Sequence, residues 1–181
     1  MTDAALWPDE LLDALLARIR EVPRPVVLID GGSGSGKSTL AGRLAPRLGA
    51  QLVRLDDVYP GWDGLEAASA HLVKEVLGDP PRWRRWDWAA ERPAEWHELD
   101  PARPLVVEGS GSLSRAARER ADLAIWIELD AAERKRRALA RDGDGYAPHW
   151  ERWAAQEAAF RARERPELLA DVVIDESRIA T

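Results

Sequence analysis

The chain has 181 residues, of which 45% are hydrophobic, and its formal net charge at pH 7 is −6. This length and apolar content allow one domain of ordinary size, which we expect to span residues 1–181. The composition excludes several classes of protein. A chain without cysteine has no disulfide framework or thiolate nucleophile, an acidic chain is not a general nucleic-acid binder, and no apolar run approaches the roughly 20 residues of a membrane span.

The segment Met1–Glu10 is acidic and lacks the apolar centre of a signal peptide. Together with the absence of cysteine, which fits a reducing compartment, this leads us to expect a cytoplasmic protein. The expected partner is a small molecule rather than a nucleic acid or a membrane. Assembly into a homo-oligomer is left open.

The first predicted element is a helix between Pro8, which can open it, and Pro23, which ends it. Apolar residues recur along it at helical spacing and predict one buried face. They are Leu11, Leu12, Leu15, Leu16 and Ile19.

A glycine-rich loop follows the first predicted strand, Val26–Asp30, and precedes a helix. It fits the pattern G-x-x-x-x-G-K-[ST] at every fixed position, and an accidental match would lack these flanks. Such a loop lets successive backbone N–H groups face one phosphate, and the helix N-terminus adds partial positive charge. We predict that it binds ATP, with Lys37 on the β- and γ-phosphates and Ser38 on Mg²⁺. The expected ATP-binding residues are Gly31, Gly32, Ser33, Gly34, Ser35, Gly36, Lys37, Ser38 and Thr39.

Strands and helices then alternate, which indicates a parallel sheet with right-handed crossovers. We expect an α/β fold of the P-loop NTPase type, a three-layer sandwich whose five-stranded parallel sheet is flanked by helices. Inside the first crossover helix, Pro46 is expected to cause a kink or early fraying. The further strands are expected at Gln51–Val58, Leu105–Glu108, Leu123–Asp130 and Asp171–Asp175. The further helices are expected at Leu65–Leu77, Ser112–Arg120, Ala131–Arg141 and Ala147–Arg165.

The proline- and tryptophan-rich region Gly78–Pro104 interrupts this alternation and is predicted to be an irregular excursion from the sheet. With the residues before it, from about 60 to 104, it is expected to bind the substrate. Flat indoles can stack on a planar or sugar ring, while arginine supplies directional hydrogen bonds. A small satellite core is the alternative for the same side chains. The candidates are Arg82, Trp83, Trp86 and Trp88.

Acidic residues stand at the ends of two predicted strands, where ligands gather in open parallel sheets. Asp56 and Asp57 follow Leu52–Leu55, and Glu108 follows Leu105–Val107. Phosphoryl transfer needs one carboxylate near Mg²⁺ and another to accept the substrate hydroxyl proton. The sequence therefore predicts Asp56 as the catalytic base, and Glu108 with Ser38 as the magnesium site.

The predicted helix Ala131–Arg141 carries Arg134, Arg137 and Arg141 at spacings of three and four, which place them on one face. A solvated basic face is the alternative. Next to a phosphate loop, these arginines favour a lid over about residues 131–148 that neutralises transition-state charge and excludes water. The segment Asp142–Gly145 would be its hinge.

Trp150 and Trp153 are interpreted as packing residues of the helix that follows the lid. The three histidines, His71, His97 and His149, lie far apart without metal-ligand spacing and receive no role.

Together these residues resemble the uridine/cytidine kinase group of P-loop kinases, whose relatives include nicotinamide riboside kinase and pantothenate kinase. The likeness runs through the glycine loop, Asp56–Pro60, Val106–Gly109 and the arginine helix after Asp130. The resemblance implies that Asp56 is the base and that Tyr59 is the second aromatic of the family's substrate segment, with Val58 in place of the first.

The function implied is ATP- and Mg²⁺-dependent phosphorylation of a hydroxyl group on a small, nucleoside-like molecule. Two alternatives stay open. One is a kinase for a non-nucleoside acceptor such as an antibiotic or aminocyclitol, and the other is a non-catalytic nucleotide-binding regulatory protein.

Overall fold

The computed structural model describes residues 7–176, and residues 1–6 and 177–181 lie outside the described part of the chain. The prediction for Met1–Glu10 therefore falls mostly outside it. A five-stranded parallel sheet with the strand order β2-β5-β1-β6-β7 forms the centre of the fold. The predicted α/β sandwich is confirmed. The strands are β1 (Val26–Gly31), β2 (Gln51–Arg54), β5 (Leu105–Glu108), β6 (Leu123–Glu128) and β7 (Val172–Asp175).

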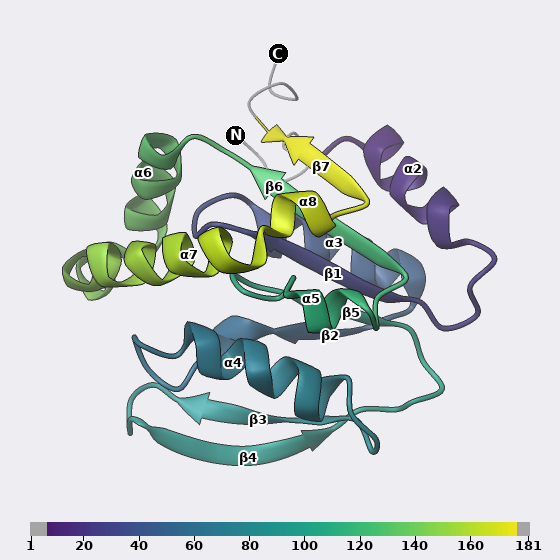
Figure 1. The fold of residues 1–181 in the computed structure, drawn as a ribbon, viewed down its shortest axis with the longest axis horizontal. Helices are drawn as coiled ribbons and strands as arrows, with labels where there is room; N and C mark the ends of the chain where they lie inside the picture. Colours follow the sequence, from purple (N-terminus) through teal and green to yellow (C-terminus); the bar gives the residue numbers. More distant parts are fainter. Residues whose placement is uncertain (1–6, 177–181) are drawn as a thin grey trace.

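Helices cover both faces of this sheet, because successive residues of its buried strands point to opposite sides. In β1, Val27 and Ile29 pack into the core with α2 and α3, whereas Leu28 packs on the other face with α4 and α7. Figure 1 shows α7 in front of β1 and α3 behind it. The α-helices are α2 (Asp9–Ile19), α3 (Lys37–Leu48), α4 (Leu65–His71), α5 (Arg115–Arg118), α6 (Ala131–Asp142), α7 (Trp150–Glu164) and α8 (Pro166–Leu169). Within residues 7–176, no helix has the length and apolarity that a membrane crossing requires.

Two predicted elements are shorter in the structure. The strand expected over Gln51–Val58 ends at Arg54, because a 3-10 turn, Leu55–Asp57, begins there, with the Val58 N–H bonded to the Leu55 carbonyl at 2.8 Å. The helix expected over Ser112–Arg120 is only α5. Ser114 caps it by accepting the Ala117 N–H at 3.2 Å.

The early fraying expected at Pro46 does not occur, since α3 continues to Leu48. Gly49 follows in the left-handed conformation, with φ 61°, and its N–H donates to the Pro46 carbonyl at 3.1 Å. The Ala50 N–H donates to the Ala45 carbonyl at 2.9 Å. These bonds satisfy the last carbonyls of the helix.

The region Gly78–Pro104 is not irregular, as we had expected. It forms an antiparallel hairpin of β3 (Arg82–Asp87) and β4 (Arg92–Glu98), which lies beside α4 at the bottom of Figure 1. Arginine and tryptophan dominate β3, where the pairing register shifts between Arg84 and Trp86, and their side chains pair across the strands. Trp83 stacks on His97 with ring centroids 4.3 Å apart, and Arg85 pairs with Glu95 at 2.6 Å.

The central position of β1 sets a stability prediction. Leu28 is 0% exposed, whereas Leu168, on α8, is 64% exposed. Leu28→Ala should lower the free energy of unfolding by about 2–5 kcal/mol because it removes buried methyl groups and leaves a cavity. The matched change Leu168→Ala should cost less than about 0.5 kcal/mol. Urea unfolding followed by circular dichroism measures both, and equal losses would contradict the assignment.

Candidate active site

The glycine loop joins β1 to α3 at the carboxyl edge of the sheet. Gly34 and Gly36 have φ values of 84° and 92°, which favour glycine, and a side chain at Gly34 would collide with the backbone carbonyl of Arg134 on α6. The buried Lys37 donates to the Gly32 carbonyl at 3.1 Å and to Ser110 Oγ at 3.5 Å. No side chain caps α3 at Gly36. The first N–H groups of α3 are therefore left to an anion.

Ser38 and Glu108, the two predicted magnesium ligands, are brought together. Ser38 Oγ donates to Glu108 Oε1 at 2.9 Å, and Arg54 Nε lies 3.8 Å from the same oxygen. Glu108 is 2% exposed, and this burial raises the pKa of its carboxyl group, although the charge of Lys37 opposes the shift. Residues 7–176 hold no cluster of three or more metal-binding His, Asp or Glu side chains. A hydroxyl and one carboxylate fit Mg²⁺, which usually takes its other ligands from water and phosphate.

Asp30 ties the glycine loop to the turn after β5. Its carboxylate accepts the backbone N–H groups of Gly31 at 2.7 Å, Gly111 at 3.1 Å and Leu113 at 2.8 Å. It is 1% exposed, and burial raises its pKa to about 6 against these hydrogen bonds and the charge of Lys37. Sequence reasoning gave Asp30 no role beyond ending a strand, although a carboxylate directly before a glycine loop was a signal.

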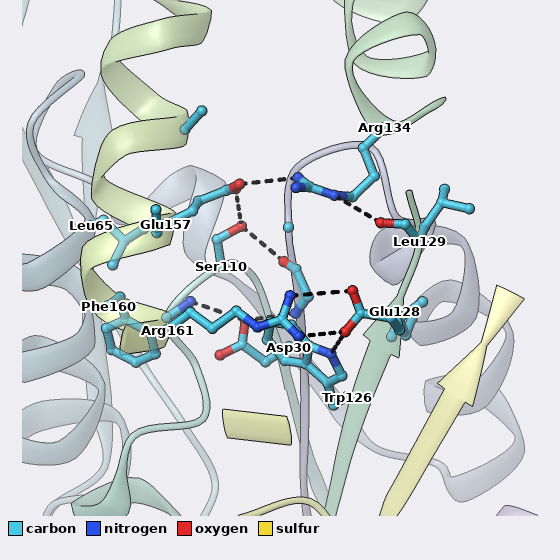
Figure 2. A pocket seen from close by; sticks show the side chains of 16 residues that line it. Asp30, Leu65, Ser110, Trp126, Glu128, Leu129, Arg134, Glu157, Phe160 and Arg161 are labelled. Carbon is cyan, nitrogen blue, oxygen red and sulfur yellow. Dashed lines mark hydrogen bonds and ion pairs between the residues drawn. The ribbon is translucent and has the colours of Figure 1, made fainter. Parts of the chain in front are cut away.

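Glu157 of α7 is a second buried carboxylate that the sequence did not reveal. It accepts the Ser33 N–H at 2.6 Å, Ser110 Oγ–H at 2.8 Å and Trp153 Nε1–H at 3.0 Å. It also pairs with Arg134 at 3.2 Å. These contacts lie along a cavity of about 160 Å³ between the loop, β6 and α7, shown in Figure 2. A carboxylate at the Ser33 N–H shows that this part of the loop can hold an anion.

The three arginines of α6 diverge, although their spacing placed them on one face. Arg134 donates to the Ser33 carbonyl at 3.3 Å and so contacts the loop. Arg141 pairs with Asp142 at 2.6 Å and lines the larger cavity described next. Arg137 reaches neither, because Glu176, at the end of β7, holds its guanidinium at 3.0 Å.

A cavity of about 440 Å³ opens beside Ser33 and lies between the lid, α7 and the hairpin. Its polar residues are Ser33, Asp56, Arg141 and Asp142, so the predicted base faces it. Its walls are aromatic, and they come from four separate segments of the chain. The aromatic residues are Tyr59, Trp62, Trp88, Tyr146 and Trp153.

The predicted tryptophan cluster contributes only Trp88 to this cavity. Trp88 Nε1 donates to the Asp56 carbonyl at 2.9 Å, which holds the hairpin against the end of β2. The structure places the other three candidates elsewhere. Trp83 stacks on His97, Arg82 pairs with Glu75 at 3.0 Å, and Trp86 lines a separate groove. For these three side chains, local packing in and around the hairpin is the better description.

Several cavity residues were missed from the sequence. Trp153, interpreted as a packing residue, also lines the cavity, edge-on to Tyr59 with centroids 4.6 Å apart. His149, given no role, stacks on the cavity residue Trp62 with centroids 4.3 Å apart. Trp62 lies just after the predicted segment Asp56–Pro60, and that position was the available signal.

The chain is similar in sequence and in fold to proteins named as kinases. No family model matches the chain. Over 123 residues it is 34% identical to a shikimate kinase from Corynebacterium efficiens, a match that covers 63% of this chain and 64% of that protein. Over 121 residues it is 30% identical to a shikimate kinase from Corynebacterium diphtheriae, and this match covers 66% of this chain and 65% of that protein. The chain thus spans less than two thirds of the length of these curated relatives.

Among solved structures, the fold is similar to a protein described as a possible uridine kinase from Bacillus stearothermophilus. The TM-score is 0.61 at 21% identity, over 91% of this chain and 97% of the other. This likeness establishes that the two proteins share a fold. The resemblance to P-loop small-molecule kinases inferred from the sequence is confirmed.

The buried carboxyl of Asp30 sets a pH dependence of stability. Its pKa is raised from 3.8 to about 6, so the folded state binds the proton more tightly than the unfolded state. This tighter proton binding stabilises the folded state fully below pH 3.8. The contribution, about 3 kcal/mol in all, is lost as the pH rises to about 6. The unfolding free energy of the wild type should fall relative to that of Asp30→Asn across this window. Urea unfolding at a series of pH values tests this, and a ¹³C NMR midpoint for Asp30 near its unfolded value would contradict it.

Proposed function

We propose that this chain is a kinase that transfers the γ-phosphoryl group of ATP to a hydroxyl group of a small molecule, with Mg²⁺ as cofactor. The observation that carries the proposal is the glycine loop, in which Lys37 bonds the Gly32 carbonyl and Ser38 bonds Glu108, beside a cavity that Asp56 lines. This arrangement supports in-line transfer from a phosphate on the loop to a hydroxyl in the cavity.

Each residue has a proposed task. The loop N–H groups and Lys37 bind the phosphates, and Ser38 and Glu108 hold Mg²⁺, which supplies charge neutralisation when bound. Asp56 accepts the proton of the acceptor hydroxyl. The hydroxyl oxygen then bonds to the γ-phosphorus, while the bond between this phosphorus and the oxygen that stays with ADP breaks. Arg134 and Arg141 neutralise the developing charge. We assign Arg137 to holding α6 through Glu176 instead.

The comparisons support this class of reaction while differing in acceptor. The curated relatives are named for shikimate and the structural neighbour for uridine, both small molecules with hydroxyl groups. A nucleoside-like acceptor is consistent with the aromatic walls, on which a base can stack. A regulatory nucleotide switch is less favoured, because it would not need a cavity of about 440 Å³ next to an acidic residue. Dependence on ATP supports the expected cytoplasmic location.

Removal of the loop ammonium should abolish the activity. Lys37→Ala should eliminate ADP formation with a panel of nucleosides, nicotinamide riboside, pantothenate and aminoglycosides, because no other cation in the loop can meet the phosphates. Lys74→Ala removes an exposed lysine and should leave the rate unchanged. A coupled assay for ADP measures both variants. Wild-type activity of Lys37→Ala would refute the proposal.

Asp56→Asn should lower turnover by about 10²–10⁴-fold, because the amide cannot accept the hydroxyl proton. Nucleotide affinity should be largely retained, since Asp56 lines the cavity rather than the phosphate end of the loop. The neighbouring change Asp57→Asn is the matched control and should keep most of the activity. Single-turnover rates and calorimetric ATP titration separate the two effects, and wild-type turnover by Asp56→Asn would remove it from the role of base.

A further inference from the structure

The larger cavity has a wall of aromatic faces whose polar edges are already used. Trp88 Nε1 donates to the Asp56 carbonyl at 2.9 Å, and Trp153 Nε1 donates to Glu157 at 3.0 Å. The Tyr59 hydroxyl donates to the Ser110 carbonyl at 2.8 Å. These three rings therefore offer a ligand their π-faces rather than hydrogen-bond donors.

The rings pack against one another along the cavity wall. Trp62 and Trp88 have centroids 5.0 Å apart and an interplanar angle of 56°, which makes a corner. Trp62 is covered by other rings, because Tyr146 lies nearly parallel to it with centroids 5.4 Å apart and His149 stacks on it at 4.3 Å. Trp88 is 38% exposed and is the ring of this wall that a ligand can reach. The negative faces of such rings attract organic cations within about 6 Å, and quaternary ammonium groups are recognised in this way.

The charged residues that line the cavity also favour a cationic ligand. Arg141 is held by Asp142 through two contacts, at 2.8 and 2.6 Å, so its charge is locally matched. Asp56 forms no ion pair with the residues that the structure describes, and it leaves the cavity lining with an excess negative charge. A carboxylate ligand would meet this charge and would find few free donors on the aromatic wall. A cation would be attracted by both the charge and the rings.

From these observations we infer that the cavity binds a hydroxyl-bearing organic cation, either an amino sugar, an aminocyclitol or a quaternary ammonium alcohol. Its charged group lies against Trp88, and its hydroxyl faces Asp56. The identification of this ligand as the phosphate acceptor rests on the proposed function. The inference that the cavity binds the ligand does not depend on that function.

The test uses pairs of probes that differ in charge and little else, titrated into the whole chain without ATP and followed by tryptophan fluorescence and calorimetry. One pair is choline and its tert-butyl analogue, in which a neutral carbon replaces the nitrogen. The other series is glucosamine, glucose and glucuronate. We expect each cation to bind about tenfold or more tightly than its neutral counterpart, and glucuronate to bind most weakly.

Variants test whether the preference for cations over neutral analogues depends on the aromatic face of Trp88. Trp88→Leu should remove most of the preference for choline, and Trp88→Phe should restore part of it, because phenylalanine keeps a π-face. Trp96→Leu alters an exposed tryptophan of the same hairpin outside the cavity and should change nothing. Equal affinity for choline and its neutral analogue, tighter binding of glucuronate, or no saturable binding of either cation would each overturn the inference.

The outcome is separable from that of the proposed kinase activity. A charge preference without ADP formation from any acceptor would reject the kinase and keep the ligand class. ADP formation with neutral acceptors only, and no charge preference, would keep the kinase and reject the ligand class.

Discussion

The hydrogen bonds of the buried Asp30 carboxylate hold the glycine loop where the rest of the site needs it. They join Gly31, at the start of the loop, to Gly111 and Leu113, after β5, across the centre of the sheet. Burial of this carboxyl is unfavourable by itself, as its raised pKa indicates. The cost is offset by three backbone donors that would otherwise have no partner. The loop is thus fixed by the strands beneath it rather than by its own flexible residues.

From this fixed edge the site is assembled out of distant segments. Lys37 donates a hydrogen bond to Ser110, and Ser110 donates one to Glu157 of α7. Glu157 in turn pairs with Arg134 of α6. Figure 2 shows the side chains of Ser110, Glu157 and Arg134 converging from different elements. The aromatic cavity lies next to this network, on the side of the hairpin. The glycine loop and the aromatic cavity are therefore built from different residues but share a boundary at Ser33.

Local patterns carried the sequence analysis furthest. The strand Leu105–Glu108 was predicted with correct bounds, and the glycine loop was placed correctly between a strand and a helix, although β1 extends to Gly31 and α3 begins at Lys37. The hairpin was missed because its strands lack a regular two-residue alternation, and the pairing register shifts between Arg84 and Trp86. Arg137 illustrates a deeper limit. Its helical face was correct, but the direction of its side chain depends on Glu176, which is remote in sequence. The convergence of Trp62, Trp88 and Tyr146 is likewise a property of the tertiary fold.

The beginning of α3 has one more consequence. Gly36 stands where most helices have a serine or aspartate, and it has no side chain with which to satisfy the first N–H groups. Glycine in place of a capping side chain weakens a helix by a few tenths of a kcal/mol. An anion seated in the loop would complete α3 as such a side chain does elsewhere. Occupancy of the loop and resistance of the whole chain to heat are thereby coupled, and the melting temperature becomes a gauge of how full the loop is.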